Sequence, residues 1–575
     1  MKKYKLMATC LVFSVMIIGS GSILASCSKS DVNDDKTTET TGYNSQDEDN
    51  AISMTAEFDI DTSINEEYID ESYDENATKV KLTETYAITN SGTYILSGDI
   101  KDGQIIVNNT DSDKVKLVFD GVNVSCSDGP AVNIIQGKTI ITLAEGSKNV
   151  LSDGTSYDSA EESACIYSCD DLCINGSGSL EVTANYKTGI QSKDDLRIVN
   201  GNITVNAIGD GIKGKDSLVI KDGTVNITAG KDGIQATNIE AEKGYVLILG
   251  GDVVISCVSD AIKAETIVEI NGGNINIEKS EEGIEAIYIR INGGDIELCS
   301  TDDGINASNG SDTDAGGEFV GGNRGGKFGG NDTQTQDSST TSSVIPVLYI
   351  NGGNLYVNAE GDGLDSNGAV YITGGNIKVD GPTNSGNGFF DYATTFEIKG
   401  GELIGCGSSG MMETPDASST QNVIVVTGIN VATGDAFIIK DSNGNEIVTY
   451  EPSKTFQAVV YSSDNIKTEE SYTAYINDTE IGNVTISGIV NYIGDAGEGM
   501  QGGFGGKDFN RGNRNPQEMP TGADGQVPPE MPTGADGQRP EIPTGADGQV
   551  PPDIPSGFGG EQEKMPFENE SGASV

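Results

Sequence analysis

Short stretches that alternate apolar with polar residues recur through the chain between about residues 85 and 410. Stretches such as 203–207 (Ile-Thr-Val-Asn-Ala) and 225–229 (Val-Asn-Ile-Thr-Ala) have the two-residue period of a strand with one buried face. A glycine turn, such as Asn-Gly-Gly-Asn at 271–274, precedes each stretch and supplies positive φ angles at little cost. No segment has a convincing 3.6-residue period, so the pattern predicts an all-β region.

A five-residue phrase punctuates these strands and reads acid, Gly or Ala, Ile, polar, small. Copies lie at 188–192 (where Thr replaces the acid), 210–214, 232–236, 260–264, 282–286 and 303–307. The second residue of the phrase recurs at intervals of 22, 22, 28, 22 and 21 residues. A fixed period of this size indicates stacked supersecondary units. Two or three short strands per repeat predict a right-handed parallel β-helix over residues 80–410, with turns about 4.8 Å apart.

Breaks in the period divide the rest of the chain. The 59 residues between Gly304 and Gly363 equal one turn plus an insertion, and the Gly/Ser-rich residues 310–343 are expected to be flexible, as a lid could be. After residue 410 the period ends, and hairpin-like strands predict a small β-sandwich or cap over 411–497. Residues 498–575 are Gly/Pro-rich with a near-repeat, which predicts a disordered tail.

The N-terminus has the pattern of an export signal. Three lysines precede an apolar run at 6–25, and Leu-Ala-Ser stands directly before Cys27, which resembles a bacterial lipobox. We therefore predict a lipoprotein signal peptide over 1–27 with Cys27 lipidated; the alternatives are a plain signal peptide or a membrane span. Residues 28–79 are rich in Asp, Glu, Ser and Thr and predict an acidic disordered tether. The protein would then be lipid-anchored on the extracellular face of a bacterial cell membrane.

Charge and composition narrow the classes of partner and chemistry. A net charge of −53 would repel a phosphate backbone, so we expect no nucleic acid partner. The natural counter-species are cations. We also expect the protein to be a monomer. Histidine and tryptophan are absent from the sequence. The missing histidine excludes Ser-His-Asp and Cys-His catalysis and His-containing zinc sites.

In stacked turns the acid and the polar residue of the phrase are predicted to form two exposed columns. Carboxylates about 4.8 Å apart repel by roughly 3.5 kcal/mol at an effective dielectric near 20, so the column requires lysines, protons or bound cations. Oxygen ligands at that spacing suit Ca²⁺, although each acid could instead only cap turn amides. The strongest sites are expected beside the insertion, where the polar column has no lysine. The predicted calcium ligands are Asp260, Glu282, Glu285, Asp302, Asp303, Asn306, Asp362 and Asp365.

The order of these segments resembles a known family. The chain has, in order, a lipobox, an acidic tether, the Gly-Thr-Tyr-Ile-Leu-Ser-Gly opening at 92–98, Asp-Gly-Ile turns, a Gly-rich insertion and a short final β region. This order resembles that of the clostridial-type carbohydrate-binding parallel β-helix lipoproteins, and the resemblance covers about residues 80–490. The resemblance implies the fold of family-nine pectate lyases, bound calcium, and attachment to polysaccharides such as cellulose and polygalacturonate. Those lyases use an Asp-x-x-Asp pair, which Asp362 and Asp365 match, and a lysine base. The next turn, 387–391, has no lysine, and Lys263 and Lys213 lie two or more turns away.

We therefore predict a cell-surface lipoprotein that binds plant or microbial cell-wall polysaccharide, polygalacturonate-like and acidic, through calcium on the carboxylate ladder. The alternatives are a calcium-dependent pectate lyase that uses Lys263 or Lys213, and a non-catalytic structural or adhesion β-helix. Neutral glucans would require aromatic platforms instead. The candidate platforms are Tyr288, Tyr349, Tyr356, Tyr371 and Phe389.

Overall fold

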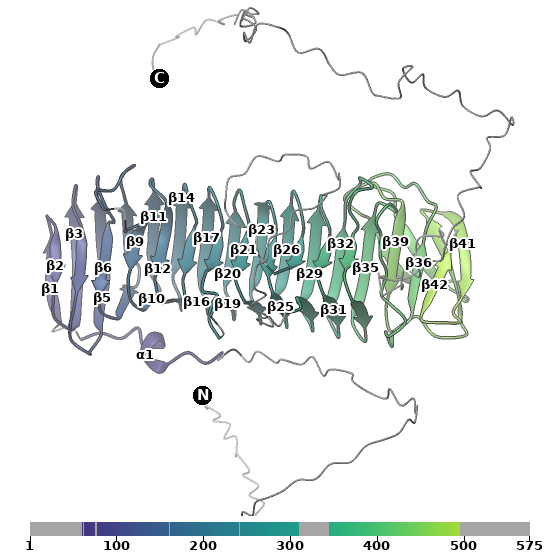
Figure 1. Cartoon of the computed structure of the whole chain (residues 1–575), viewed down its shortest axis with the longest axis horizontal. Helices are drawn as coiled ribbons and strands as arrows, with labels where there is room; N and C mark the ends of the chain where they lie inside the picture. Colours follow the sequence, from purple (N-terminus) through teal and green to yellow (C-terminus); the bar gives the residue numbers. More distant parts are fainter. Residues whose placement is uncertain are drawn as a thin grey trace, which may run out of the picture. The chain divides into compact units, whose positions relative to one another are not determined.

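The computed structural model describes residues 60–494 apart from 61, 75–76, 160, 241 and 310–343. Several predicted features lie outside the described residues: the signal peptide with Cys27, the first part of the tether, the insertion at 310–343 and the tail from 498. Figure 1 shows the described strands stacked in chain order as successive turns of a parallel β-solenoid. The prediction of an all-β chain built on a parallel β-helix is confirmed.

Each complete turn contributes one strand to each of three faces. The pentad face carries the repeated phrase and is a 12-stranded sheet. Its strands are β2 (Tyr86–Ile88), β4 (Ile105–Asn108), β6 (Val132–Gln136), β9 (Ala164–Ser168), β12 (Thr188–Ser192), β15 (Ile212–Gly214), β18 (Ile234–Ala236), β21 (Ile262–Ala264), β24 (Ile284–Ala286), β27 (Ile305–Ala307), β30 (Leu364–Ser366) and β33 (Phe390–Tyr392).

The strap face is named for the N-terminal segment that crosses it. Its strands are β1 (Thr78–Leu82), β3 (Gly92–Ile100), β5 (Val115–Ser125), β7 (Thr139–Leu143), β10 (Leu172–Gly176), β13 (Asp195–Ile198), β16 (Ser217–Ile220), β19 (Tyr245–Ile248), β22 (Ile267–Ile270), β25 (Tyr288–Ile291), β28 (Val347–Ile350), β31 (Ala369–Ile372) and β34 (Thr395–Ile398). The strands of the third face are β8 (Lys148–Ser152), β11 (Ser179–Ala184), β14 (Asn202–Ala207), β17 (Thr224–Ala229), β20 (Asp252–Ser256), β23 (Asn274–Ser280), β26 (Asp295–Ser300), β29 (Asn354–Ala359), β32 (Asn376–Asp380) and β35 (Glu402–Gly407).

The apolar residue of the phrase builds the interior, as the period predicted. Parallel pairing aligns this residue from turn to turn, and all eight members of the column have 0% exposed surface. They are Ile190, Ile212, Ile234, Ile262, Ile284, Ile305, Leu364 and Phe390. Because parallel turns superpose equivalent positions, one local code repeated along the chain yields one continuous core.

Stacked glycine turns join the strap face to the third face. Gly273 has φ +97°, and a Cβ there would lie 2.9 Å from the backbone oxygen of Gly251 on the previous turn. Only glycine fits both the backbone conformation and the close approach. The Asn-Gly-Gly-Asn signature therefore marks corners where one turn lies directly on another.

The C-terminal strands close the solenoid with antiparallel pairing. They are β36 (Val423–Val426), β37 (Phe437–Asp441), β38 (Glu446–Tyr450), β39 (Ala458–Ser462), β40 (Ser471–Ile476), β41 (Thr479–Thr485) and β42 (Val490–Ile493). Strand β39 pairs antiparallel with β35, whereas β37, β38, β40 and β41 form a separate four-stranded sheet. Asp380 of the solenoid, 1% exposed, accepts hydrogen bonds from the Tyr450 hydroxyl (2.7 Å) and the Ser453 amide (2.6 Å). A buried carboxylate thus joins this terminal region to the last turns.

Residues 62–74 differ from the predicted disordered tether. They form a strap that includes α1 (Glu66–Ile69) and lies against the strap face. Ile60 packs against Val219, Leu247 and Ile267, whereas Tyr68 packs farther toward the first turns. This segment packs because it has an apolar residue at every fourth position, 60, 64 and 68. The prediction of disorder rested on its overall acidic composition and did not take this spacing into account.

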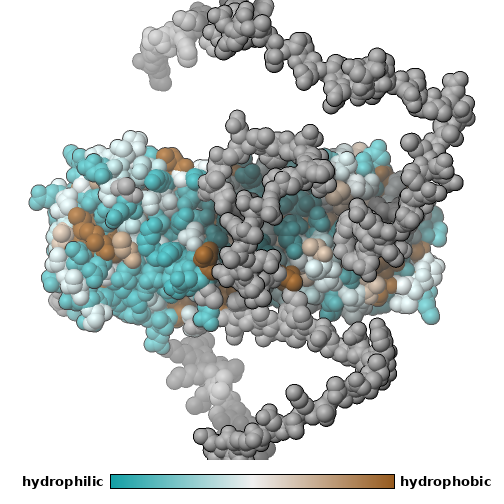
Figure 2. All heavy atoms as spheres, in the orientation of Figure 1, coloured by the Kyte–Doolittle hydropathy of each residue, from teal (hydrophilic) through white to brown (hydrophobic). Residues whose placement is uncertain are grey.

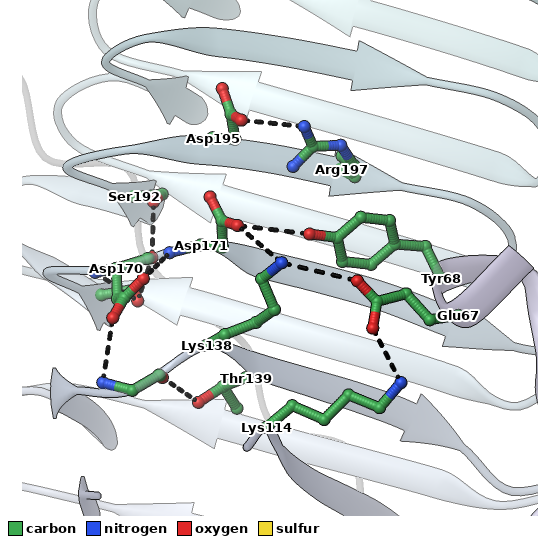
Figure 3. Close-up of polar contacts among 12 residues, drawn as sticks. Glu67, Tyr68, Lys114, Lys138, Thr139, Asp170, Asp171, Ser192, Asp195 and Arg197 are labelled. Carbon is green, nitrogen blue, oxygen red and sulfur yellow. Dashed lines mark hydrogen bonds and ion pairs between the residues drawn. The ribbon is translucent and has the colours of Figure 1, made fainter. Parts of the chain in front are cut away.

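Tyr68 is the main anchor of the strap (Figure 3). It is 2% exposed, and its hydroxyl donates to the Asp171 carboxylate at 3.2 Å. The Lys138 amine and the Arg197 guanidinium lie 5.1 and 4.8 Å from the centroid of its ring, within cation–π range. Glu67 adds ion pairs to Lys138 (3.4 Å) and to Lys114 (3.0 Å).

The outer surface follows the alternation of the strands. The side shown in Figure 2 is mainly hydrophilic, with apolar side chains scattered between the polar ones. Within the described ranges no helix has the length and apolar character needed to cross a membrane.

Candidate functional site

The pentad face brings the predicted polar and acidic columns together. Strand register places the polar residues of consecutive turns side by side, and backbone hydrogen bonds align the acids of consecutive turns in the same way. The polar column runs Lys213, Gln235, Lys263, Glu285, Asn306, Asp365 and Asp391. We call the acids of both columns from Asp260 to Asp391, together with Asn306, the acid row. The predicted stacking of the two columns is confirmed.

The prediction that these side chains are exposed is wrong for much of the row. Asp260, Glu285 and Asn306 are only 8%, 5% and 9% exposed. Side chains of adjacent turns pack against one another at the spacing of paired strands, and this lateral packing removes water from most of their surface. Asp302, in contrast, is exposed at the corner beside Asp303.

The first half of the row is built around a lysine. Asp260, Glu282 and Glu285 have carboxylate oxygens within 4.8 Å of one another, a grouping that could hold a metal ion. However, the Lys263 amine lies 2.8 Å from Asp260 and 2.6 Å from Glu285. The expectation of a lysine-free column at Glu285 is therefore wrong, because Lys263 reaches it from the preceding turn.

This arrangement does not suit lysine to proton abstraction. Burial lowers the pKa of Lys263, but its hydrogen bonds to Asp260 and Glu285 outweigh burial and raise the pKa above the ordinary lysine value. Lys213 pairs with Asp210 at 3.2 Å. A general base must be a neutral amine, and paired carboxylates favour the ammonium form.

Among the described residues, the carboxylates of the second half of the row pair with no cation. Burial, followed by neighbouring acids, raises the pKa of Asp303 to about 7, of Asp362 to about 6 and of Asp365 to about 8. The same causes raise the pKa of Glu282 to about 9. Among the described side chains, no lysine or arginine forms an ion pair with these four acids.

Asn306 provides the observation that best tests whether the row fits a metal. Its amide nitrogen donates to both oxygens of Glu282 at 3.2 and 3.3 Å. Its Oδ1 is buried and has no hydrogen-bond partner among the described residues. Buried acceptors are nearly always satisfied, so this oxygen lacks a donor or a cation. Carboxylate and amide oxygens are ligands that Ca²⁺ accepts, and the row therefore fits calcium.

Two acids at this end of the face were not predicted as site residues: Asp391, which belongs to the acid row, and Glu413, which lies beside it. Asp391 aligns with Asp365, and burial raises its pKa. The register could have revealed it, but Phe390 stands in the column where isoleucine was expected. Glu413 comes from the non-repeating loop after β35, and burial followed by Asp391 raises its pKa to about 7. No repeat signal marks Glu413.

The structure divides the predicted aromatic platforms between two faces. Three of them lie on the strap face: Tyr288 is the first residue of β25, Tyr349 lies within β28 and Tyr371 lies within β31. The rings of Tyr349 and Tyr371 are stacked, with their centroids 5.3 Å apart. Tyr356 lies on the third face, with its hydroxyl 2.9 Å from the Asp380 carboxylate. Phe389 is 0% exposed and belongs to the core, so it cannot serve as a platform.

These features define a parallel β-helix protein with a row of closely spaced carboxylate and amide oxygens along one face. The chain belongs to the family of carbohydrate-binding domain-containing proteins, whose model matches residues 83–323 and 279–388. The predicted membership of a carbohydrate-binding β-helix family is thereby confirmed. The matched residues contain the acid row up to Asp365.

Individual relatives match over parts of the chain. A carbohydrate-binding domain-containing protein of Acetivibrio thermocellus is 41% identical over 126 residues, which cover 21% of this chain and 44% of the relative. This chain thus spans less than half the length of that relative. A solved structure of a polysaccharide lyase-like protein from C. thermocellum, a gadolinium derivative, is 35% identical, covers 42% of this chain and 92% of its own, and has a TM-score of 0.33.

Proposed function

We propose that this carbohydrate-binding protein holds acidic cell-wall polysaccharide, of the polygalacturonate type, through Ca²⁺ on the acid row. The second half of the row carries the proposal: the unpartnered oxygen of Asn306 stands in register with Asp365, beside acids that share no ion-paired lysine in the described chain. A chain with net charge −53 repels a polyuronate unless a cation lies between them. A bound Ca²⁺ would give the Asn306 oxygen a partner and would also offset the repulsion between the protein and a polyuronate.

The row's own residues have distinct roles in this proposal. Asp303, Asp362, Asp365 and Asn306 would offer oxygens to the ion, and Lys263 neutralises the acids of the preceding turns. When bound, Ca²⁺ would supply the positive charge that joins a protein carboxylate to a sugar carboxylate. Since the row follows the solenoid axis, a linear polysaccharide could meet equivalent groups on successive turns.

The test is affinity electrophoresis of the full chain through polygalacturonate with calcium or with EDTA. We expect retention with calcium and its loss in EDTA. The double variant Asp303→Asn, Asp365→Asn should lose retention with calcium, whereas the matched control Asp222→Asn, on an exposed turn away from the row, should keep it. If EDTA changes neither retention nor thermal stability, the calcium proposal is wrong.

The same incubation tests the lyase alternative. Absorbance of unsaturated uronate product is followed while the protein is incubated with polygalacturonate and calcium. We expect no product, because Lys263 is held in its charged form. Steady product formation that Lys263→Ala abolishes would overturn the binding-only proposal.

We also propose that Cys27 carries a lipid that holds the protein on the extracellular face of a bacterial membrane. The support is the lipobox-like Leu-Ala-Ser-Cys at 24–27 behind an apolar run. Labelled fatty acid should enter the wild-type protein and not Cys27→Ser. Equal labelling of both would contradict lipidation at this cysteine.

A further inference from the structure

An apolar surface continues along the strap face beyond the strap. Strand register aligns its side chains in two rows on β25, β28 and β31. We call it the tyrosine surface, and its residues are Tyr288, Val347, Tyr349, Ala369 and Tyr371. Each of the five is followed along its strand by a residue of the interior, so the tyrosine surface faces outward.

Charged and polar residues bound the tyrosine surface at both ends. On the side of the strap, Glu269 of β22 forms an ion pair with Arg290 of β25 at 2.8 Å. On the other side, the two rows continue on β34 with Thr395 and Glu397, and Glu397 pairs with Lys399 at 2.5 Å. The apolar surface therefore covers three turns and ends at β31.

The strap reaches the edge of this surface. Tyr68 packs over β7 and β10, whereas Ile60 packs over β16, β19 and β22. Followed back toward the N-terminus, the strap thus advances along the solenoid axis toward later turns. Tyr288, the first residue of the tyrosine surface, packs against the same apolar cluster as Ile60. The apolar contact of the strap and the tyrosine surface are therefore continuous.

The residues ahead of Ile60 have the sequence pattern expected of a segment that covers an apolar surface. Residues 52–60 read Ile-Ser-Met-Thr-Ala-Glu-Phe-Asp-Ile, in which every second residue is apolar. Strict alternation over such a length is typical of an extended segment with one buried side. The intervening residues include Glu57 and Asp59, which the same alternation would direct to solvent.

The length of this segment also matches the surface. Eight residue steps from Ile60 to Ile52 extend about 26 Å, at about 3.3 Å per residue. The distance along the axis from β22 to β31 is about 14 Å, since it comprises three turns at about 4.8 Å each. An extended segment that begins at Ile60 can therefore cross the whole tyrosine surface.

We propose that residues 52–59 dock on the tyrosine surface and extend the strap from β22 to β31. The occupant is this segment because it is attached to Ile60, which gives it an effective concentration on the order of millimolar at the surface. The chain ahead of residue 52 would then leave the solenoid beside its later turns rather than beside β1. The rings of Tyr349 and Tyr371 would serve the protein's own chain. The proposal goes beyond the proposed function and depends on neither calcium nor the lipid.

The test is hydroxyl-radical footprinting of the full chain, read by mass spectrometry, which measures how far solvent reaches each tyrosine. In the double variant Met54→Asp, Phe58→Asp, we expect Tyr371 to be oxidised about threefold faster or more, because the apolar side of the segment is lost. The matched control Ser53→Asp, Thr55→Asp adds the same charge on the polar side and should oxidise as the wild type does. Tyr94 of β3 is the internal reference for an intact solenoid and should not change.

A photo-crosslinker tests the contact directly. With p-benzoylphenylalanine in place of Phe58, we expect a crosslink to the peptide that contains β25 or β28, at the mass of one chain. The same group in place of Thr55 should give much less of it. Equal oxidation of Tyr371 in wild type and both double variants, or an equal rise in both, would overturn the proposal. A crosslinked product at twice the chain mass would assign the surface to a second copy and would also overturn it, while the calcium test stays unaffected.

Discussion

Replacing Asp365 with asparagine should stabilise the calcium-free protein at pH 8. Burial, followed by Asp303, Asp391 and Asp362, raises the pKa of Asp365 from 3.8 to about 8. A carboxyl with a pKa higher in the folded than in the unfolded chain favours folding less as pH rises between those two values. The cost of its charge is thus small near pH 4 and largest at and above pH 8.

The size of the effect follows from the shift. A shift of about four pKa units, at 1.36 kcal/mol per unit, sets an upper limit of about 5 kcal/mol at pH 8. Partial contact with solvent and screening by salt reduce this limit, and we expect a gain of about 2 kcal/mol. At pH 5, one unit above the unfolded pKa, the same limit is only about 1.5 kcal/mol, so the gain should fall below about 1 kcal/mol.

The measurement is urea unfolding of wild type, Asp365→Asn and Asp222→Asn in EDTA at pH 5 and pH 8. Asp365→Asn should unfold at a higher urea concentration than the wild type at pH 8, and the control should show no pH-dependent gain. With calcium present, Asp365→Asn should unfold at a lower urea concentration than the wild type, because the variant has lost a charged carboxylate ligand of the ion. Equal gains at both pH values, or a loss at pH 8 in EDTA, would refute the electrostatic reasoning.

Three further variants test other contacts. Lys263→Met leaves Asp260 and Glu285 without their cation, so it should cost about 2–3 kcal/mol in EDTA at pH 8 and less at pH 5; urea midpoints equal to wild type at pH 8 would contradict this. Tyr68→Ala should weaken docking of the strap by about 3 kcal/mol, seen as proteolysis within 62–74 that Tyr68→Phe largely resists. Asp380→Ala removes the acceptor for Tyr450 and should cost about 2–4 kcal/mol, with earlier hydrogen exchange in β38 than in wild type; unchanged exchange would count against the link.

The repeat made the solenoid and its register predictable. In each phrase the isoleucine alternates with a polar neighbour, so a 22-residue period fixes which residues stack and which face inward. Asp365 could be placed beside Asn306 from spacing alone, even across a 59-residue interval, because the strands on both sides keep the same code. Local patterning is enough when every turn repeats it.

The same pattern does not predict how deeply a side chain is buried or which side chain of a neighbouring turn it contacts. Period tells that Glu285 points away from the core, but not that its neighbours bury it to 5% exposure. Lys263 reaches a carboxylate on the next turn, which depends on side-chain length and rotamer rather than on register. Glu413 lies beside the row on a loop with no repeat. The ordered strap depends on three apolar residues, at 60, 64 and 68, within an acidic segment.

The strap also determines how the solenoid responds to tension. A pull applied to the chain ahead of Ile60 acts first on Ile60 and its apolar pocket, then on Tyr68, and reaches β1 only when both have detached. Contacts that detach one after another dissipate mechanical work in steps, so the strap is expected to detach before the solenoid unfolds. Among the described strands β1 pairs only with β3, and this first turn carries no load until both strap contacts have detached.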